Sequence, residues 1–150
     1  MGKIVFDDDP DNQPEARYEG INYVDKVSCK EVIRYNEGAD KKKVVLVDCG
    51  VKTNIIRCLL KRGVEVIRVP WNYDFTGMEY DGLFISNGPG DPDTCDEAVQ
   101  NIRKAMALSD KPIFGICMGN QLLSKAGGAT IYKLKYGHRS HNQPVRMVGT

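Results

Sequence analysis

Residues 44–48, Val-Val-Leu-Val-Asp, form a continuous apolar run that ends in a carboxylate. A strand without polar alternation is expected where both faces of a sheet are buried, as in mostly parallel sheets. The run therefore predicts a central strand that other elements must cover on both sides.

Strand and helix patterns alternate along the rest of the chain. Further strands are predicted at 64–69, 82–86 and 111–116, and helices at 54–62, 94–108 and 118–126. The helix at 94–108 is expected to bury a face made of Ala98, Ile102, Ala105 and Met106. Val145 and Met147 could begin another strand. This alternation predicts an α/β fold with a mostly parallel sheet and flanking helices.

The N-terminal segment has a different composition. Residues 1–40 are polar and rich in Asp, Asn and Glu, with only short apolar stretches. We predict a connector or the tail of a preceding domain over 1–40, and the α/β domain over 41–150.

Cys117 lies between the strand and helix predicted around it, with Gly115 and Gly119 on either side. This is the thiol version of the nucleophile elbow, in which a tight strand-to-helix turn holds a reactive atom clear of the sheet. The positive end of the helix dipole favours thiolate over thiol. A buried structural cysteine is the alternative. The two glycines and the change from strand to helix favour the nucleophile.

A second turn, Asn-Gly-Pro-Gly-Asp-Pro at 87–92, follows the strand at 82–86. Such pairs with proline also occur in plain turns. Two glycines, however, leave backbone N–H groups open to form an oxyanion hole for acyl transfer, and the Met118 amide is a natural second donor. Ligands bind beyond the carboxyl ends of the strands in these sheets, so we predict that 87–92 and 117–121 face one pocket.

Charge and composition exclude several functions. Lys and Arg number 21 against 20 Asp and Glu, so the net charge of +1 gives no electrostatic footprint for nucleic acid or a membrane surface. No apolar stretch approaches the roughly 18 residues that a transmembrane helix needs. The five cysteines show no paired spacing, which predicts neither a metal site nor disulfides and favours a cytoplasmic location.

The 87–92 loop together with residues 115–121 resembles the class I, triad-type glutamine amidotransferases. The resemblance implies a flavodoxin-like α/β fold with a Cys–His–Glu triad. Residues 132–145 are similar to a Lys-x-x-Gly-His-Arg-x-x-Asn-x-Pro stretch of the small, glutamine-hydrolysing subunit of carbamoyl-phosphate synthetases, which serve arginine or pyrimidine synthesis. Residues 48–54 resemble the opening of that domain.

The same resemblance implies roles for individual residues. Cys117 is the nucleophile, and family members that depend on free ammonia can lack it. Gly88 and Gly90 contact glutamine, with Gly90 contributing to the oxyanion hole. Met118 offers its backbone and Gln121 its side-chain amide. Ammonia would pass to a synthetase large subunit, or to a fused synthetase domain, that uses bicarbonate, ATP and Mg²⁺. No cofactor is expected in this chain.

The family's catalytic His and Glu are expected farther downstream than the residues that follow Cys117 here. The chain is therefore interpreted as a C-terminally incomplete fragment that is inactive alone. His138 and His141 are its only histidines. Either could serve as a base, but both belong to the family's turn segment and are interpreted as structural or surface residues.

Two alternatives remain open. One is a class I amidotransferase of another pathway, such as anthranilate or guanylate synthesis, against which the 132–145 segment argues. The other is a non-catalytic docking or regulatory domain that keeps the fold. A nucleotide-binding domain is disfavoured because residues 50–54 lack a Gly-x-Gly-x-x-Gly loop.

Overall fold

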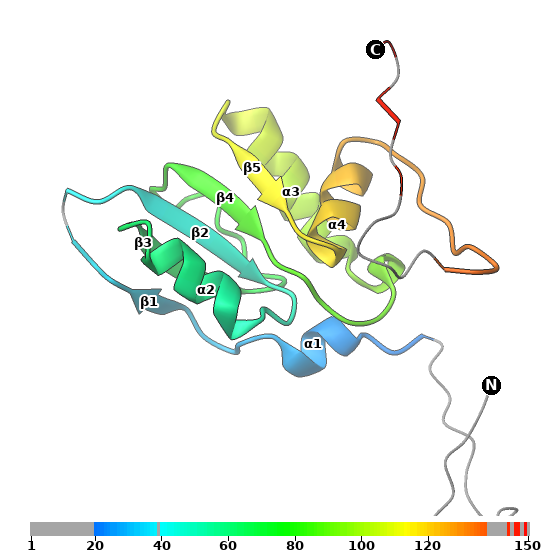
Figure 1. Ribbon diagram of the computed structural model, residues 1–150, viewed down its shortest axis with the longest axis horizontal. Coiled ribbons are helices and arrows are strands. Elements are labelled where there is room, and N and C mark those ends of the chain that lie inside the picture. The colour runs from blue at the N-terminus through cyan, green and yellow to red at the C-terminus, as the bar shows by residue number, and fades with distance from the viewer. Residues whose placement is uncertain (1–19, 39, 138–143, 145, 148, 150) are drawn as a thin grey trace, which may run out of the picture.

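The computed structural model describes residues 20–38, 40–137, 144, 146–147 and 149, and it contains one sheet flanked by helices (Figure 1). The elements in chain order are α1 (Tyr23–Val27), β1 (Ile33–Tyr35), β2 (Lys43–Asp48), α2 (Thr53–Leu60), β3 (Glu65–Pro70), β4 (Gly82–Ile85), the 3₁₀ helix η2 (Pro92–Thr94), α3 (Asp96–Leu108), β5 (Ile113–Gly115) and α4 (Met118–Ala126).

The strands of the sheet are ordered β1-β3-β2-β4-β5. The pairs β2–β3, β2–β4 and β4–β5 are parallel. Among the described strands only β1, at the edge against β3, runs antiparallel. The four parallel strands lie in the order β3-β2-β4-β5, so the first of them in the chain, β2, lies between the second, β3, and the third, β4. This is the order of a flavodoxin-like doubly wound sheet. The predicted fold class is confirmed.

Successive residues of β2 face two different cores. Val45 and Val47 are buried in the larger core, which also contains side chains of α3 and α4. Leu46 is buried in the smaller core beside Ile56 of α2. Burying one such side chain stabilises the fold by roughly 1.5–3 kcal/mol. Both faces of β2 are covered, and this is why its sequence does not alternate with polar residues.

The connection from β3 to β4 buries three aromatic side chains in the larger core. Trp71, Phe75 and Tyr80 are each no more than 9% exposed. The ring centroids of Phe75 and Tyr80 lie 6.3 Å apart in an edge-on arrangement, which is favourable for aromatic pairs. The connection therefore contributes to the core without forming a helix.

The N-terminal segment contributes to this domain as well. Val24 of α1 is 1% exposed in the larger core, and β1 pairs with β3 from Ile33 opposite Arg68 to Tyr35 opposite Val66. Residues 22–35 therefore belong to the sheet and its core rather than to a connector. A three-residue edge strand with an exposed polar residue in the middle has too little pattern to be recognised. Residues 1–19 lie outside the described residues.

Three details differ from the predicted elements. Met106 is 42% exposed, because the buried face of α3 ends at Ala105, and Leu108 beyond it is 70% exposed. The strand predicted at 111–116 is shorter and spans only β5. Met147 lies in no helix or strand, and Val145 is outside the described residues. Among the described residues, no helix combines the length and apolar character that crossing a membrane requires.

Candidate active site

Cys117 lies in the turn between β5 and α4, in a conformation that is unusual for a residue with a side chain. Its φ is 53° and its ψ is −109°, close to the first central residue of a type II′ turn, where glycine is normal. Such backbone strain costs about 1–3 kcal/mol and persists only where the surrounding structure enforces it. Cys117 is exposed and directly precedes the first turn of α4. The elbow geometry predicted from the sequence is present.

Close backbone packing enforces this turn. A Cβ atom on Gly115 would lie 2.5 Å from the carbonyl carbon and oxygen of Gly119, which no real contact allows. A Cβ atom on Gly119 would collide with the carbonyl oxygen of Ile85, at the end of β4. The Ile116 N–H donates to Ile85 O, and the Gly119 N–H donates to Ser86 O, both at 3.0 Å. The elbow is therefore fastened to the end of β4.

The loop after β4 is held just as closely. A Cβ atom on Gly88 would collide with the carbonyl oxygen of Cys49, just after β2. Ser86 Oγ accepts the Cys49 N–H at 2.9 Å and donates to Asn87 O at 2.8 Å. Asn87 Nδ2 donates to Gly50 O at 3.1 Å. The ends of β2 and β4 are thus joined where the strand order reverses, which is where doubly wound sheets bind ligands.

The two predicted loops lie at the same edge of the sheet. β4 and β5 are parallel neighbours, and the loops 87–92 and 117–121 follow them. Lys125 of α4 also connects the helix after Cys117 to the end of the 87–92 loop, because it donates to Pro92 O at 3.4 Å and forms a 2.7 Å ion pair with Asp93. The predicted common edge is confirmed. A pocket shared by both loops remains a prediction.

The other predicted contacts come from the first turn of α4. Met118 is 2% exposed with its side chain in the larger core, so its backbone is the part that can serve a ligand. Its N–H is one of the first helical donors, which have no acceptor one turn earlier. Gln121 is half-buried, and its N–H donates to Cys117 O at 3.1 Å. The substrate contacts of Gly88, Gly90, Met118 and Gln121 remain predictions.

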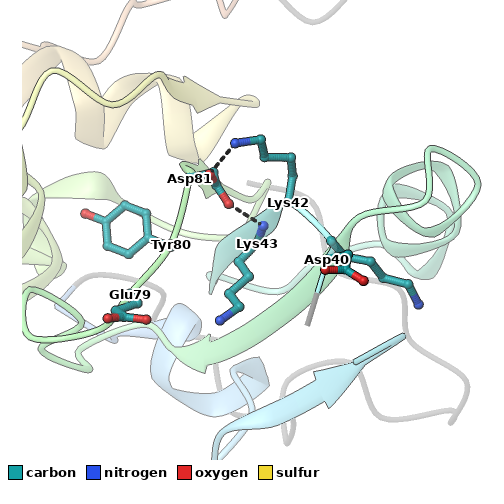
Figure 2. Close-up of a pocket in the computed structure, with 7 residues that line it drawn as sticks. Asp40, Lys42, Lys43, Glu79, Tyr80 and Asp81 are labelled. Carbon is teal, nitrogen blue, oxygen red and sulfur yellow. Dashed lines mark hydrogen bonds and ion pairs between the residues drawn. The ribbon is translucent and has the colours of Figure 1, made fainter. Parts of the chain in front are cut away.

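A pocket of about 370 Å³ lies at the opposite edge of the sheet, where β2 begins (Figure 2). It is lined by mostly charged side chains from two turns: Asp40, Lys41, Lys42, Lys43, Glu79, Tyr80 and Asp81. Asp81 forms a 2.8 Å ion pair with Lys42 and accepts the Lys43 N–H at 2.8 Å. Neither cysteine nor histidine lines this pocket, so we place the candidate site at the other edge, with Cys117.

Asp48, the last residue of β2, organises the Cys117 edge and was not among the predicted site residues. It is fully buried, and one carboxylate oxygen accepts the Gly50 and Val51 N–H groups at 2.9 and 2.8 Å. The other oxygen accepts the Cys29 N–H at 2.8 Å and two Arg68 donors at 2.6 and 2.9 Å. Burial acts to raise the pKa of Asp48, but these hydrogen bonds outweigh it and hold the pKa below its ordinary value. A carboxylate two residues before a glycine is a turn signal that could have indicated this role.

Asp48→Asn is expected to destabilise the domain by about 2–3 kcal/mol near neutral pH. The amide oxygen can still face Gly50 and Val51, but the NH₂ group would meet the Cys29 and Arg68 donors. Because folding lowers the pKa of Asp48, its contribution is fully present above the unfolded value of about 4 and is lost as pH falls through the folded value.

Urea denaturation of the domain at pH 7 and near pH 3 tests this expectation. The difference between the wild type and Asp48→Asn should shrink at the lower pH. Asp81→Asn is the matched control, because its ion pair with Lys42 is exposed and the asparagine oxygen can still accept the Lys43 N–H, so the change should matter little. Equal stability of the wild type and Asp48→Asn at pH 7 would contradict the role given to this carboxylate.

The proton donor of the predicted triad is not among the described residues. His138 and His141 lie outside them, as do the other residues of 138–143 in the segment on which the narrower resemblance rests. Across the described part of the chain, no group of three or more His, Cys, Asp or Glu side chains could hold a metal ion.

Comparison with known proteins decides the family. The family model for class I glutamine amidotransferases matches residues 45–149, more than half of the chain. The chain belongs to the class I glutamine amidotransferase family. The match includes Cys117 and the 87–92 loop of the amidotransferase domain, and it begins within β2, after α1 and β1. The family predicted from the sequence is confirmed.

Several curated proteins are similar over nearly the whole chain. The multifunctional protein CAD of Squalus acanthias is 47% identical over 156 residues, which cover 100% of this chain and 7% of that protein. A carbamoyl phosphate synthase small chain of Pyrococcus furiosus is 49% identical over 140 residues, which cover 91% of this chain and 38% of that one. The human mitochondrial carbamoyl-phosphate synthase [ammonia] is 46% identical over 146 residues, which cover 97% of this chain and 10% of that protein. The chain thus spans well under half the length of these relatives.

A solved structure supports the fold. The chain is similar to the crystal structure of a GMP synthase subunit from Thermoplasma acidophilum, with a TM-score of 0.58 and 28% identity. The similarity covers 67% of this chain and 52% of the other. The amidotransferase domain therefore shares its fold with a protein whose name refers to a different product.

Proposed function

We propose that this amidotransferase domain is the glutamine-hydrolysing part of a carbamoyl-phosphate synthetase and supplies ammonia to a synthetase partner, either separate or fused. The observation that carries the proposal is the exposed, strained Cys117 at the start of α4. The names of the relatives at 46–49% identity support the choice of pathway. The carbamoyl phosphate would serve arginine or pyrimidine synthesis.

The reaction would begin with attack by the Cys117 thiolate on the side-chain amide carbon of glutamine. The S–C bond forms while the C=O electrons move onto oxygen, giving a tetrahedral oxyanion. The backbone N–H groups of Gly90 and Met118 would donate to this oxygen. Removing one such donor typically costs about 10²–10³-fold in kcat, so the placement of these two N–H groups contributes strongly to the rate.

The second half releases ammonia and regenerates the thiol. The oxyanion collapses to re-form the C=O bond, and the C–N bond breaks as a general acid gives its proton to the leaving nitrogen, leaving a γ-glutamyl thioester on Cys117. The same group, now a base, takes a proton from water as the water oxygen attacks the thioester; the C–S bond then breaks, and the thiolate and glutamate are released. General acid–base catalysis of this kind contributes about 10²–10⁴-fold, and the resemblance assigns it to the family's His–Glu pair.

Two features argue against the alternatives. A docking domain would gain nothing from keeping a cysteine in a conformation that costs about 1–3 kcal/mol, whereas a nucleophile elbow requires it. The neighbour whose name refers to GMP synthesis is 28% identical, against 46–49% for the carbamoyl-phosphate relatives. The presence of Cys117 also favours glutamine as the nitrogen source over free ammonia.

The proposal also covers the ligands of the synthetase partner and the cellular compartment of the reaction. ATP, Mg²⁺ and bicarbonate would be bound by the synthetase partner and not by this domain. The five cysteines are free thiols, which suits the reducing cytoplasm.

Protection by glutamine tests the proposal on the full-length gene product. Iodoacetamide should label Cys117 before Cys29, Cys49 and Cys95, since burial raises the pKa of Cys29 to about 11 and also raises the pKa of Cys49 and Cys95. Glutamine should suppress labelling of Cys117, because the substrate and then the thioester cover the sulfur. Mass-spectrometric mapping of each cysteine provides the measurement.

Cys58 is the internal control for this experiment. It is exposed like Cys117 but lies within α2, away from the candidate site, so glutamine should not change its labelling. Preferential labelling of Cys29 or Cys95, or a Cys117 reactivity that glutamine leaves unchanged, would contradict the proposed function.

A further inference from the structure

α1 packs against the loop that carries Gly90 (Figure 1). A Cβ atom placed on Gly90 would lie 3.2 Å from Tyr23 Cβ and 3.3 Å from Tyr23 Cδ2, so Tyr23 closes that side of the glycine. Farther along the same segment, Asn22 Nδ2 donates to Thr94 O at 2.8 Å. Two adjacent residues at the start of α1 therefore hold segment 90–94 at both ends.

α1 is itself fixed to the body of the domain. Val24 is 1% exposed in the larger core. Trp71 donates its backbone N–H to Ser28 Oγ at 3.0 Å and its Nε1–H to Asp25 at 3.1 Å. Asn22 caps the helix by accepting the Asp25 N–H at 3.0 Å. The contacts that α1 makes with the loop are therefore anchored in the core and not in a free chain end.

We propose that Tyr23 and Asn22 are positioning residues for the glutaminase reaction, because they hold Gly90 where its N–H can donate to the oxyanion. The proposal rests on the proposed function. Gly90 is exposed, has a φ of +88°, and as a glycine samples many backbone conformations unless a neighbour restrains it. A donor stabilises the transition state most when it is already aimed before the reaction starts.

The location of α1 makes this role additional to the family's common core. The match to the family model begins at residue 45, after both α1 and β1. Tyr23 and Gly90 are also far apart in the sequence, so only the folded structure brings them together. The N-terminal segment would therefore complete the glutamine site from outside the region that defines the family.

Tyr23→Ala should remove the contact while leaving the Asn22 cap in place. In steady-state assays on the full-length gene product, kcat/KM for glutamine should fall about ten- to hundredfold. The fall should be mainly in kcat, because a misdirected N–H donor weakens the binding of the transition state more than the binding of glutamine. Tyr23→Phe keeps the Cβ and the ring carbon that lie nearest to Gly90, so its kcat/KM should be clearly higher than that of Tyr23→Ala. Carbamoyl phosphate formation from added ammonia should not change in either variant.

Asn22→Asp separates the loop contact from the folding of α1. Aspartate is as good an N-cap as asparagine, so the acceptor for the Asp25 N–H is kept. The donor to Thr94 O is lost, and a carboxylate would face that carbonyl instead. Like Tyr23→Ala, this variant should lower kcat for glutamine.

Tyr73→Ala is the matched control, because it removes the same side chain from a 37% exposed position in the β3–β4 connection. Glutamine kinetics of Tyr23→Ala equal to those of Tyr73→Ala would overturn the proposal. A parallel loss of ammonia-dependent synthesis would also overturn it, since that indicates a general structural defect. Failure of the proposed function looks different: the wild-type protein itself would show no Cys117-dependent glutamine hydrolysis, and this proposal would fall with it.

Discussion

Cys117→Ser is expected to reduce glutamine-dependent carbamoyl phosphate formation by roughly 10³-fold or more while leaving ammonia-dependent formation intact. Losing the nucleophile of a covalent mechanism removes nearly all of its chemical advantage, and the remaining donors cannot replace it. Serine differs from cysteine by one atom at an exposed position, so the fold should not change. Steady-state rates of the full-length gene product with each nitrogen source provide the measurement.

Two matched variants separate chemistry from structure. Cys58→Ser makes the same atomic change at an exposed position of α2 and should leave both rates unchanged. Cys117→Gly should be as inactive as the serine variant but at least as stable as the wild type, because glycine adopts a φ of 53° without strain. Glutamine-dependent turnover that survives in Cys117→Ser would eliminate the thioester mechanism.

The apolar pattern predicted the centre of the fold well, because continuous burial leaves a direct record in the sequence. Val45, Leu46 and Val47 are apolar since each faces one of two cores. The glycines around Cys117 were equally informative, because no larger residue fits against the end of β4 or the first turn of α4. The apolar run and the glycines could both be read from the sequence, because in each case the space around a position determines which residue type can occupy it.

The parts that the sequence did not predict depend on contacts between distant residues. β1 is a three-residue edge strand stabilised by pairing with β3, so its own residues carry little pattern. The contact of Tyr23 with Gly90 depends on where α1 docks, and an isolated tyrosine gives no sign of it. Asp48 could be recognised as a turn residue, but its bonds to Cys29 and Arg68 require the folded sheet.

Gly119→Ala is expected to destabilise the domain by about 4 kcal/mol or more and to lower kcat/KM for glutamine by about 100-fold in the molecules that remain folded. The added methyl group would collide with the carbonyl oxygen of Ile85, which is backbone at the end of a buried strand. No rotamer change can relieve that collision. Either the elbow moves away from β4 or the strand end shifts, and in both cases Cys117 leaves its position relative to Gly90.

Gly77→Ala is the matched control, because nothing lies within 4 Å of its would-be Cβ and its φ is not positive. It should leave activity unchanged and stability within about 0.5 kcal/mol. Urea denaturation and glutaminase kinetics on both variants show whether the losses come from the methyl group at position 119 or would follow any glycine-to-alanine substitution. If Gly119→Ala were as stable and as active as Gly77→Ala, the close packing of the elbow against β4 would not be what holds Cys117 in its strained conformation, and that conformation would lose its structural explanation.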